Sequence, residues 1–229
     1  MVLLLLQLLI IVIVIVLIVL WGYYYPYPSP IILSFLPPRK RWPETQIRSW
    51  LKIGKIQRSY LDYFYRDPER TPPLGNGILA PADGLVTSAE LRDGLRYLVI
   101  ALSFWDMHIQ RSPVSGMVIK VETIGKDFMD GEGREFAFLR EKPCPVQKRV
   151  IISTDSGEIA VRLITSLAAR RIEVWVRDGE IVVRGQRIGR ILLGSTVVLE
   201  LPVILNLSVF VGQRVTAGKT VVAHRMTTV

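Results

Sequence analysis

An apolar run at the N-terminus is the feature of this chain that most restricts how it can fold. From Val2 to Leu20 the only polar side chain is Gln7, and a run of this length can cross the hydrocarbon core of a bilayer as a helix. A cleaved secretory signal is the alternative, but it would carry a basic residue before the run and small residues after it. Here the run ends in Trp21 and a group of tyrosines, which is typical of a membrane interface. We therefore predict a retained transmembrane anchor.

Basic residues follow the anchor. The net charge of the chain is +9, and the segment from Arg39 to Arg58 holds seven bases against one acid, Glu44. Because positively charged flanks stay on the cytoplasmic side, the sequence predicts a cell-membrane protein with its body in the cytoplasm. The bases lie beside an apolar segment and no nucleic-acid-binding module is recognisable, so an anionic membrane is the expected partner rather than nucleic acid.

The sequence divides into three parts. Residues 1–36 form the anchor and a short apolar patch that can dip into the interface, and residues 37–66 form a basic linker. Within that linker, residues 44–64 carry apolar and basic residues at helical spacing on different sides, which predicts an amphipathic helix. Two placements stay open for this helix, which can pack on the body or lie on the membrane. Residues 67–229 form the body.

The body shows the pattern of a mainly β domain. Turn signals such as Asp83-Gly84 and Asp178-Gly179 recur along it, and the runs between them are short and rich in Val and Ile. This spacing is typical of a β-barrel or β-sandwich. The predicted strands include residues 149–153, 158–164, 172–177, 181–183 and 196–201.

The segment from Val211 to Val222 resembles the hammerhead strand of biotinyl and lipoyl carrier domains, so a carrier role is one hypothesis. Those carriers hold a lysine on a tight hairpin between two such halves. Lys219 instead lies inside the run. We therefore expect a barrel-sandwich-like β domain without a carrier function.

Candidate catalytic groups are few. The single cysteine, Cys144, excludes an internal disulfide, and no cluster of metal-ligating residues is visible, so no metal is expected. Of the two histidines, His224 lies near the C-terminus, where a structural or solvated role is favoured. His108 follows Asp106 by two positions, which places both side chains on one face of an extended segment. Such a pair suits general acid–base catalysis, although a structural role is equally open.

A Gly-Ser bond stands between two of the predicted strands. In a strained turn the hydroxyl of Ser195 can attack the carbonyl of Gly194, because glycine leaves that carbonyl accessible. An ordinary turn is the alternative, and by itself the dipeptide favours that alternative.

Five stretches in order resemble the phosphatidylserine decarboxylase family in its short form, which includes archaetidylserine decarboxylases. The resemblance covers residues 64 to about 222, whereas residues 128–142 match poorly and receive no role. The stretches are Phe64-Tyr65-Arg66-Asp67-Pro68-Glu69-Arg70, Ala80-Pro81-Ala82-Asp83-Gly84, Asp106-Met107-His108 through Arg111-Ser112-Pro113, Ala168-Ala169-Arg170-Arg171-Ile172, and Leu193-Gly194-Ser195-Thr196.

This resemblance implies a self-processing enzyme. The chain is expected to cut itself between Gly194 and Ser195, and Ser195 becomes a covalent pyruvoyl group. The ketone of that group forms a Schiff base with the amine of a serine phospholipid, and CO₂ is lost. The two products, residues 1–194 and 195–229, are expected to stay together as a heterodimer, and a higher homo-oligomer is left open.

The resemblance also implies roles for individual residues. Asp83 and Asp106 are expected to support the cut, and His108 to serve in decarboxylation. The long form of the family has a second histidine where Arg111 stands, and arginine cannot act as a base, so the base for self-cleavage stays open. The candidates for binding the carboxylate or phosphate of the substrate are Arg111, Arg170 and Arg171.

The expected function is that of a pyruvoyl-dependent carboxy-lyase that converts archaetidylserine or phosphatidylserine to the ethanolamine lipid. The chemistry involves only the serine head group, so diacyl and ether-linked isoprenoid lipids are both open. The alternative is a non-enzymatic, membrane-tethered β module that binds anionic lipids.

Overall fold

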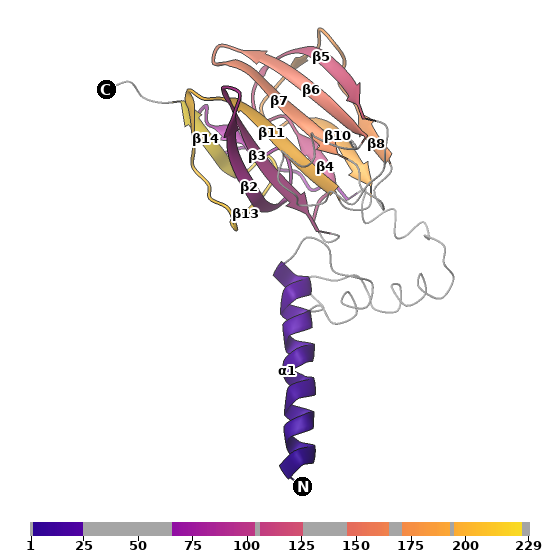
Figure 1. Cartoon of the computed structure of the whole chain (residues 1–229). Helices are drawn as coiled ribbons and strands as arrows, with labels where there is room; N and C mark the ends of the chain where they lie inside the picture. The colour runs from indigo at the N-terminus through magenta and orange to yellow at the C-terminus, as the bar shows by residue number, and fades with distance from the viewer. Residues whose placement is uncertain are drawn as a thin grey trace.

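In a computed structural model the chain has an N-terminal helix and a β domain (Figure 1). The structure describes residues 2–24, 66–103, 106–125, 146–164, 171–192 and 195–225. The predicted amphipathic helix over residues 44–64 and the basic cluster of the linker lie outside the described residues.

The N-terminal run forms helix α1, Val2–Tyr24. Its described side chains, residues 4–20, are apolar except for Gln7 and mostly exposed. Among the described residues, no helix is both long enough and apolar enough to cross a membrane. The predicted helix is therefore confirmed, and its predicted transmembrane character is not.

The remaining described residues form antiparallel strands and their connections. The strands are β1 Ile78–Leu79, β2 Gly84–Arg92, β3 Leu95–Leu102, β4 Ile109–Arg111, β5 Gly116–Ile124, β6 Gln147–Thr154, β7 Gly157–Ile164, β8 Arg171–Val174, β9 Ile181–Val182, β10 Arg187–Leu192, β11 Ser195–Pro202, β12 Leu205–Leu207, β13 Arg214–Val215 and β14 Val221–Arg225.

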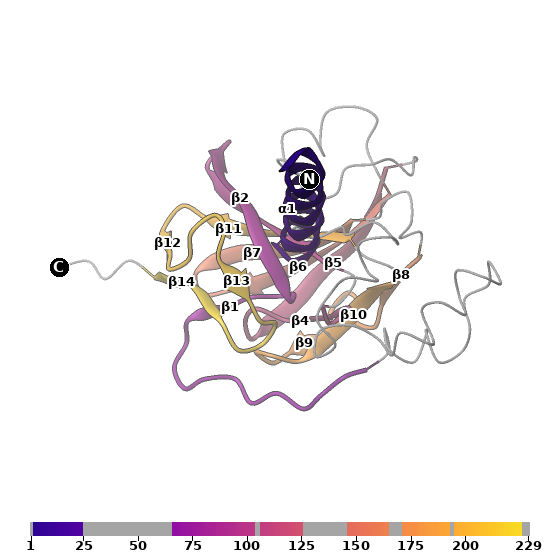
Figure 2. The same ribbon diagram turned by 90° about the horizontal axis from the view of Figure 1, so that it is seen from below.

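These strands build one large sheet and two small ones. The large sheet has the order β13-β2-β3-β11-β7-β6-β5-β9 and curls into a half-barrel, as Figures 1 and 2 show. The small sheets have the orders β4-β10-β8 and β1-β14-β12. The mainly β prediction is thus confirmed. The predicted strand over residues 172–177 is shorter, because β8 ends at Val174.

Alternation along the strands separates the two faces of the large sheet. One face of β3 and β11 supplies residues such as Ile100 and Leu199 to the main hydrophobic core, and the other face supplies a smaller cluster with Val99 and Val198. Glu200 is buried near this smaller cluster and forms ion pairs with Arg149 and Arg162. The curled sheet therefore encloses its core on one side, as a half-barrel requires.

The burial of side chains in the core predicts how leucine substitutions change the free energy of unfolding. Leu163 in β7 is fully buried, whereas Leu91 in β2 is 63% exposed. We expect Leu163→Ala to lower the free energy of unfolding by about 2–5 kcal/mol, because it removes buried methyl groups and leaves a cavity. The matched substitution Leu91→Ala is expected to change it by less than about 0.5 kcal/mol. Urea unfolding followed by circular dichroism measures both, and equal losses in the two variants would contradict this assignment of the core.

Candidate active site

Two connections join the same two sheets. The chain passes from β3 to β4 through residues 103–108, and from β10 to β11 through residues 193–194. Strands β3 and β11 are antiparallel neighbours with Leu102 opposite Ser195, and β4 and β10 are antiparallel neighbours with Ile109 opposite Arg190. The described residues that flank the two connections are therefore neighbours: Ser195 lies opposite Leu102 in one sheet, and Arg190 lies opposite Ile109 in the other.

The predicted cleavage site is only partly described. Ser195 is the first residue of β11, and Gly194 and Arg170 lie outside the described residues. Arg171 begins β8, and its Cα stands opposite Leu192 at the end of β10. The backbone register therefore places Leu192, the end of β10, beside Arg171, and Ser195, the start of β11, beside Leu102.

His108 lies at the end of the 103–108 connection and is completely buried. Its Nδ1 is 2.8 Å from the carbonyl oxygen of Asp106. Because a carbonyl can only accept, Nδ1 carries the proton and the lone pair of the neutral ring resides on Nε2. The carbonyl oxygen of His108 accepts a hydrogen bond from the N–H of Ile191 at 3.1 Å. That bond joins the 103–108 connection to β10.

The surroundings keep His108 neutral at pH 7. Burial lowers the pKa of its imidazole to about 3, because the charged form loses its hydration. The hydrogen bond to the carbonyl of Asp106 raises the pKa, the nearby charge of Arg66 lowers it, and that of Asp83 raises it. The ring is therefore a proton acceptor whose basicity depends on the charges brought near it.

Asp106 closes the turn before His108. One carboxylate oxygen, Oδ2, accepts a hydrogen bond from the N–H of Ser103 at 2.7 Å, and the N–H of Asp106 bonds back to the carbonyl of Ser103 at 3.0 Å. The other oxygen, Oδ1, pairs with the guanidinium of Arg214 from β13. These bonds fix the turn that presents His108.

Asp83 is held in the same way by a second arginine. Arg70 binds both of its carboxylate oxygens, at 2.5 and 2.8 Å, and the N–H of Ala217 donates to Oδ1 at 2.8 Å. The next residue, Gly84, has a positive φ of 153°, and a Cβ there would lie 2.3 Å from the carbonyl oxygen of Ala101. Glycine therefore lets β2 begin directly after Asp83 and approach β3 closely.

Arg111 contacts the chain itself. Its guanidinium donates to Asp67 at 2.7 Å and to the carbonyls of Gly185 and Pro68 at 3.0 and 3.3 Å. Its side chain also fills the space where a Cβ on Gly218 would stand. These contacts hold the segment at residues 66–70 against the domain, and the expected role of Arg111 in binding substrate stays a prediction.

The structure adds residues to which the sequence pattern gave no role. Arg70 and Arg214 bind the two predicted acids from distant positions in the chain. Gln110 is fully buried, two residues after His108, and neither atom of its amide has a hydrogen-bond partner. A bound molecule or water can satisfy that amide. Arg70 could have been suspected, because it lies in a stretch that carries the family resemblance.

Within the described residues, no group of three or more His, Cys, Asp or Glu side chains is arranged to hold a metal ion. Asp83 and Asp106 are each paired with an arginine, so a guanidinium group neutralises the charge of each carboxylate. The described residues therefore offer a buried neutral imidazole and two ion pairs, Asp83–Arg70 and Asp106–Arg214, which we call the ionic clamps.

Comparison with known proteins identifies relatives of this chain. The sequence model for phosphatidylserine decarboxylase matches residues 60–223. A protein of Archaeoglobus fulgidus, provisionally named an archaetidylserine decarboxylase proenzyme, is 38% identical over 159 residues, which cover 69% of this chain and 75% of that protein. A phosphatidylserine decarboxylase proenzyme of Solibacter usitatus is 34% identical over 164 residues, covering 72% and 78% of the two chains.

The burial of His108 predicts a pH dependence of stability. Its folded pKa of about 3 lies below the unfolded value near 6.5, so the unfolded chain binds more protons between these two values. Stability is therefore lost as the pH falls from about 6.5 towards 3, by at most about 1.4 kcal/mol per pH unit from this group.

Urea unfolding at a series of pH values measures this slope. We expect His108→Gln to lose that part of it, and the exposed His224→Gln to keep it. A wild-type slope that His108→Gln leaves unchanged would show that His108 is not buried in its neutral form.

Proposed function

This chain belongs to the phosphatidylserine decarboxylase family, and we propose that it makes its own catalytic group and then decarboxylates a serine phospholipid. As a member of this family it is a carboxy-lyase. The observation that supports the proposal is the pairing of β3 with β11 and of β4 with β10, together with the hydrogen bond from Ile191 at the end of β10 to the carbonyl of His108.

The first reaction is the cut between Gly194 and Ser195. The Ser195 hydroxyl attacks the carbonyl carbon of Gly194, the amide C–N bond breaks, and an ester forms. Elimination then releases the new carboxylate of Gly194 and leaves dehydroalanine at residue 195, which takes up water, releases ammonia and becomes pyruvoyl. Asp83 and Asp106 support this step by fixing the position of the neighbouring connection, and Nε2 of His108 is the candidate proton acceptor.

The position of residue 195 fits such a group. It begins β11 directly after a glycine and lies opposite Leu102, six residues before the buried His108. When formed, a pyruvoyl ketone supplies the electron sink for loss of CO₂ from the substrate amino acid. The residues of this chain supply the binding, the exclusion of water and the proton transfers.

His108 is the candidate for the proton transfers of decarboxylation. With a pKa of about 3 the free ring is a weak base. The carboxylate and phosphate of a serine phospholipid bring negative charge into the site, and negative charge near an imidazole raises its pKa. His108 can then hold a proton and return it to the carbon that has lost CO₂. The amide of Gln110, on the same side of the extended chain, is a candidate partner for the substrate.

Three arginines remain the proposed substrate-binding residues. Arg171 begins β8 opposite the end of β10, next to the proposed cleavage bond, and Arg170 precedes it. Their position favours contact with the phosphate or carboxylate of the substrate. Arg111 is already bonded to Asp67 and two carbonyls, so it holds the walls of the site in addition to its proposed contact with the substrate.

Two features support attachment of the protein to a membrane: the lipid nature of the proposed substrate and the apolar N-terminal segment. The described side chains of α1 are apolar, except for Gln7, and mostly exposed. Exposed apolar surface of this kind is stabilised by lipid. The basic residues between Arg39 and Arg58 then favour the cytoplasmic side of the cell membrane for the β domain.

The two chains made by the cut are expected to stay together. After the cut, β11 belongs to the shorter chain, yet it lies between β3 and β7 in the middle of the large sheet. Strand β14 lies between β1 and β12 in a small sheet. Separation would break both ladders of β11 and expose its buried side chains, so a heterodimer of residues 1–194 and 195–229 is the proposed mature form.

The test of this function is the fate of Ser195. We expect the purified chain to contain two pieces, with a pyruvoyl group at residue 195, and to release CO₂ from phosphatidylserine. Ser195→Ala is expected to give one uncut chain of about 26.0 kDa and no measurable CO₂. Ser208→Ala, an exposed serine of the same short chain, is expected to behave as wild type.

Denaturing gels with mass spectrometry, and CO₂ release from labelled lipid, measure these outcomes. Active wild-type protein that consists only of the uncut chain would refute the proposal. So would lipid decarboxylation that survives in Ser195→Ala.

The same assay tests the lipid class. Only the serine head group takes part in the chemistry, so we expect ethanolamine product from both diacyl phosphatidylserine and ether-linked archaetidylserine. Thin-layer chromatography of the products measures this. Complete rejection of one lipid would show that the site also recognises the tails.

A further inference from the structure

A tight turn between β12 and β13 presents two apolar side chains to the outside. Phe210 is 69% exposed and Val211 is 55% exposed. The turn is closed by a hydrogen bond from the N–H of Gln213 to the carbonyl of Phe210 at 3.1 Å, and Gly212 has a φ of +94°. This is the geometry of a type II turn, which requires glycine at its third position. The turn therefore holds both apolar side chains at its tip.

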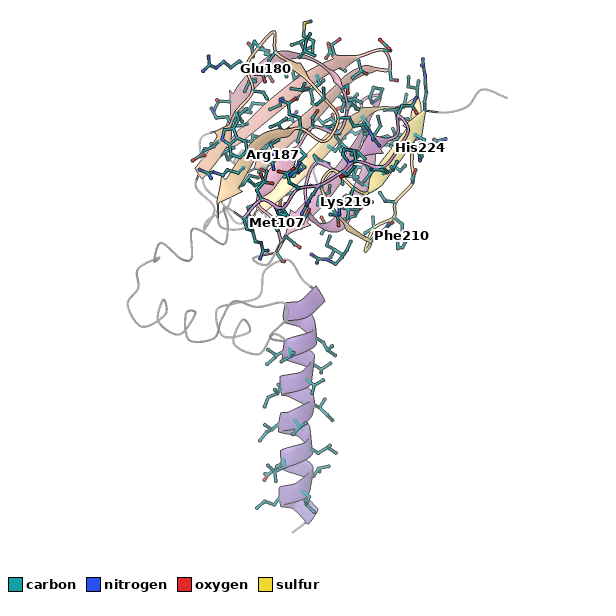
Figure 3. All side chains as sticks on the ribbon, turned by 180° about the vertical axis from the view of Figure 1, so that it is seen from behind. Met107, Glu180, Arg187, Phe210, Lys219 and His224 are labelled. Carbon is teal, nitrogen blue, oxygen red and sulfur yellow. The ribbon has the colours of Figure 1, made fainter. Side chains whose placement is uncertain are left out.

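This turn is bonded to the strand that begins at the candidate site. The N–H of Gly212 donates to the carbonyl of Val86 at 2.8 Å, and the N–H of Val86 donates to the carbonyl of Gln213 at 2.9 Å. The next residue after the turn, Arg214, is the partner of Asp106. Figure 3 shows Phe210 and Met107, the neighbour of His108, at the same end of the β domain, with Glu180 at the opposite end. The apolar tip thus lies on the rim of the candidate site.

A second turn beside β13 adds a positive charge to the same rim. The N–H of Lys219 donates to the carbonyl of Thr216 at 3.1 Å, and the side chain of Lys219 is exposed. Within this turn, the N–H of Ala217 is bonded to Asp83. Figure 3 shows Lys219 between Met107 and Phe210. Apolar side chains next to a cation are the combination that binds the interface of an anionic bilayer.

We propose that the turn from Phe210 to Gln213 inserts its tip into the lipid surface, with Lys219 at the level of the head groups. This contact orients the mouth of the active site towards the bilayer and shortens the path of a serine head group to residue 195. The inference rests on the proposed function for its purpose, since it concerns how the lipid substrate reaches that site. It adds a docking contact from the short chain, separate from the N-terminal segment.

The size of the patch favours lipid over a protein partner. A stable protein interface buries about 800 Å² on each partner and needs many contacting residues. A single turn with two exposed apolar side chains supplies far less than this area. Insertion into a bilayer interface requires only a few such side chains, since lipid surrounds each of them.

Two valines allow a matched test by fluorescence. Val211 and Val183 are similarly exposed, 55% and 60%, and Val183 lies outside the proposed docking turn, directly after β9. In the full chain with Cys144→Ser, an environment-sensitive dye is attached to Val211→Cys or to Val183→Cys. The proteins are reconstituted in mixed phosphatidylcholine and phosphatidylglycerol vesicles with brominated acyl chains. We expect a blue shift and quenching at residue 211 and neither at residue 183.

Kinetics test what the contact does. We expect Phe210→Ser/Val211→Ser to lower kcat/KM about tenfold for phosphatidylserine in vesicles, because it removes the apolar surface that enters the lipid. With short-chain monomeric phosphatidylserine the same variant is expected to keep wild-type activity, which also shows that it folds and cuts itself. The control variant Ile181→Ser/Val183→Ser, altered in and directly after β9 and outside the docking turn, is expected to match wild type with both substrates.

The outcomes separate the two proposals. If no version of the chain releases CO₂ from the short-chain lipid, the proposed function fails, while quenching at residue 211 still tests docking on its own. If both lipids are turned over but residue 211 is not quenched, the docking turn is refuted. A dye shift at residue 211 that depends on protein concentration and not on lipid would also refute it, in favour of contact between two copies.

Discussion

The pairing of two strand pairs, β3 with β11 and β4 with β10, fixes the place at which chemistry is possible. Each pair is antiparallel, and each pair joins the same two stretches of the chain, so Ser195 is fixed opposite Leu102 in one sheet and Ile109 is fixed opposite Arg190 in the other. A shift of one residue in either ladder would turn the side chains of a whole strand to its other face. The buried residues of β11 and β3 oppose such a shift. The geometry around residue 195 therefore depends on the core of the sheet and not on loop conformation alone.

Two ionic clamps complete that geometry. Asp83 with Arg70, and Asp106 with Arg214, join residues that are far apart in the sequence and have little exposed surface on their carboxylates. A partly buried pair of this kind adds little net stability, but removing one partner leaves a charge without compensation. The clamps therefore hold the backbone on both sides of His108 in one arrangement. This is the property that a site for proton transfer needs, because transfer requires fixed distances.

Some of these features could be predicted from the sequence, and others could not. Strands such as β7 and β11 could be predicted because alternation and turn signals are local, and His108 with Asp106 could be paired because they are two residues apart. The clamps could not be predicted, since Arg70 and Arg214 reach their partners only through the fold. The length of β8 was predicted wrongly, because its ladder with β10 ends at Val174 while the apolar pattern continues. Residue 195 was singled out by the family resemblance, as no local pattern distinguishes it from an ordinary turn.

The clamps also explain how a self-cleaving chain can keep a working site. Arg214 and the N–H of Ala217 lie after the proposed cut, whereas Asp106 and Asp83 lie before it. Once the covalent link is gone, these bonds and the two ladders of β11 must hold the new chain end beside His108. The proposed lipid-docking turn begins four residues before Arg214, on the same short chain. Lipid bound at Phe210 would therefore act on β13, the strand whose Arg214 binds Asp106. Membrane contact and the position of the catalytic histidine are thus coupled through this short strand.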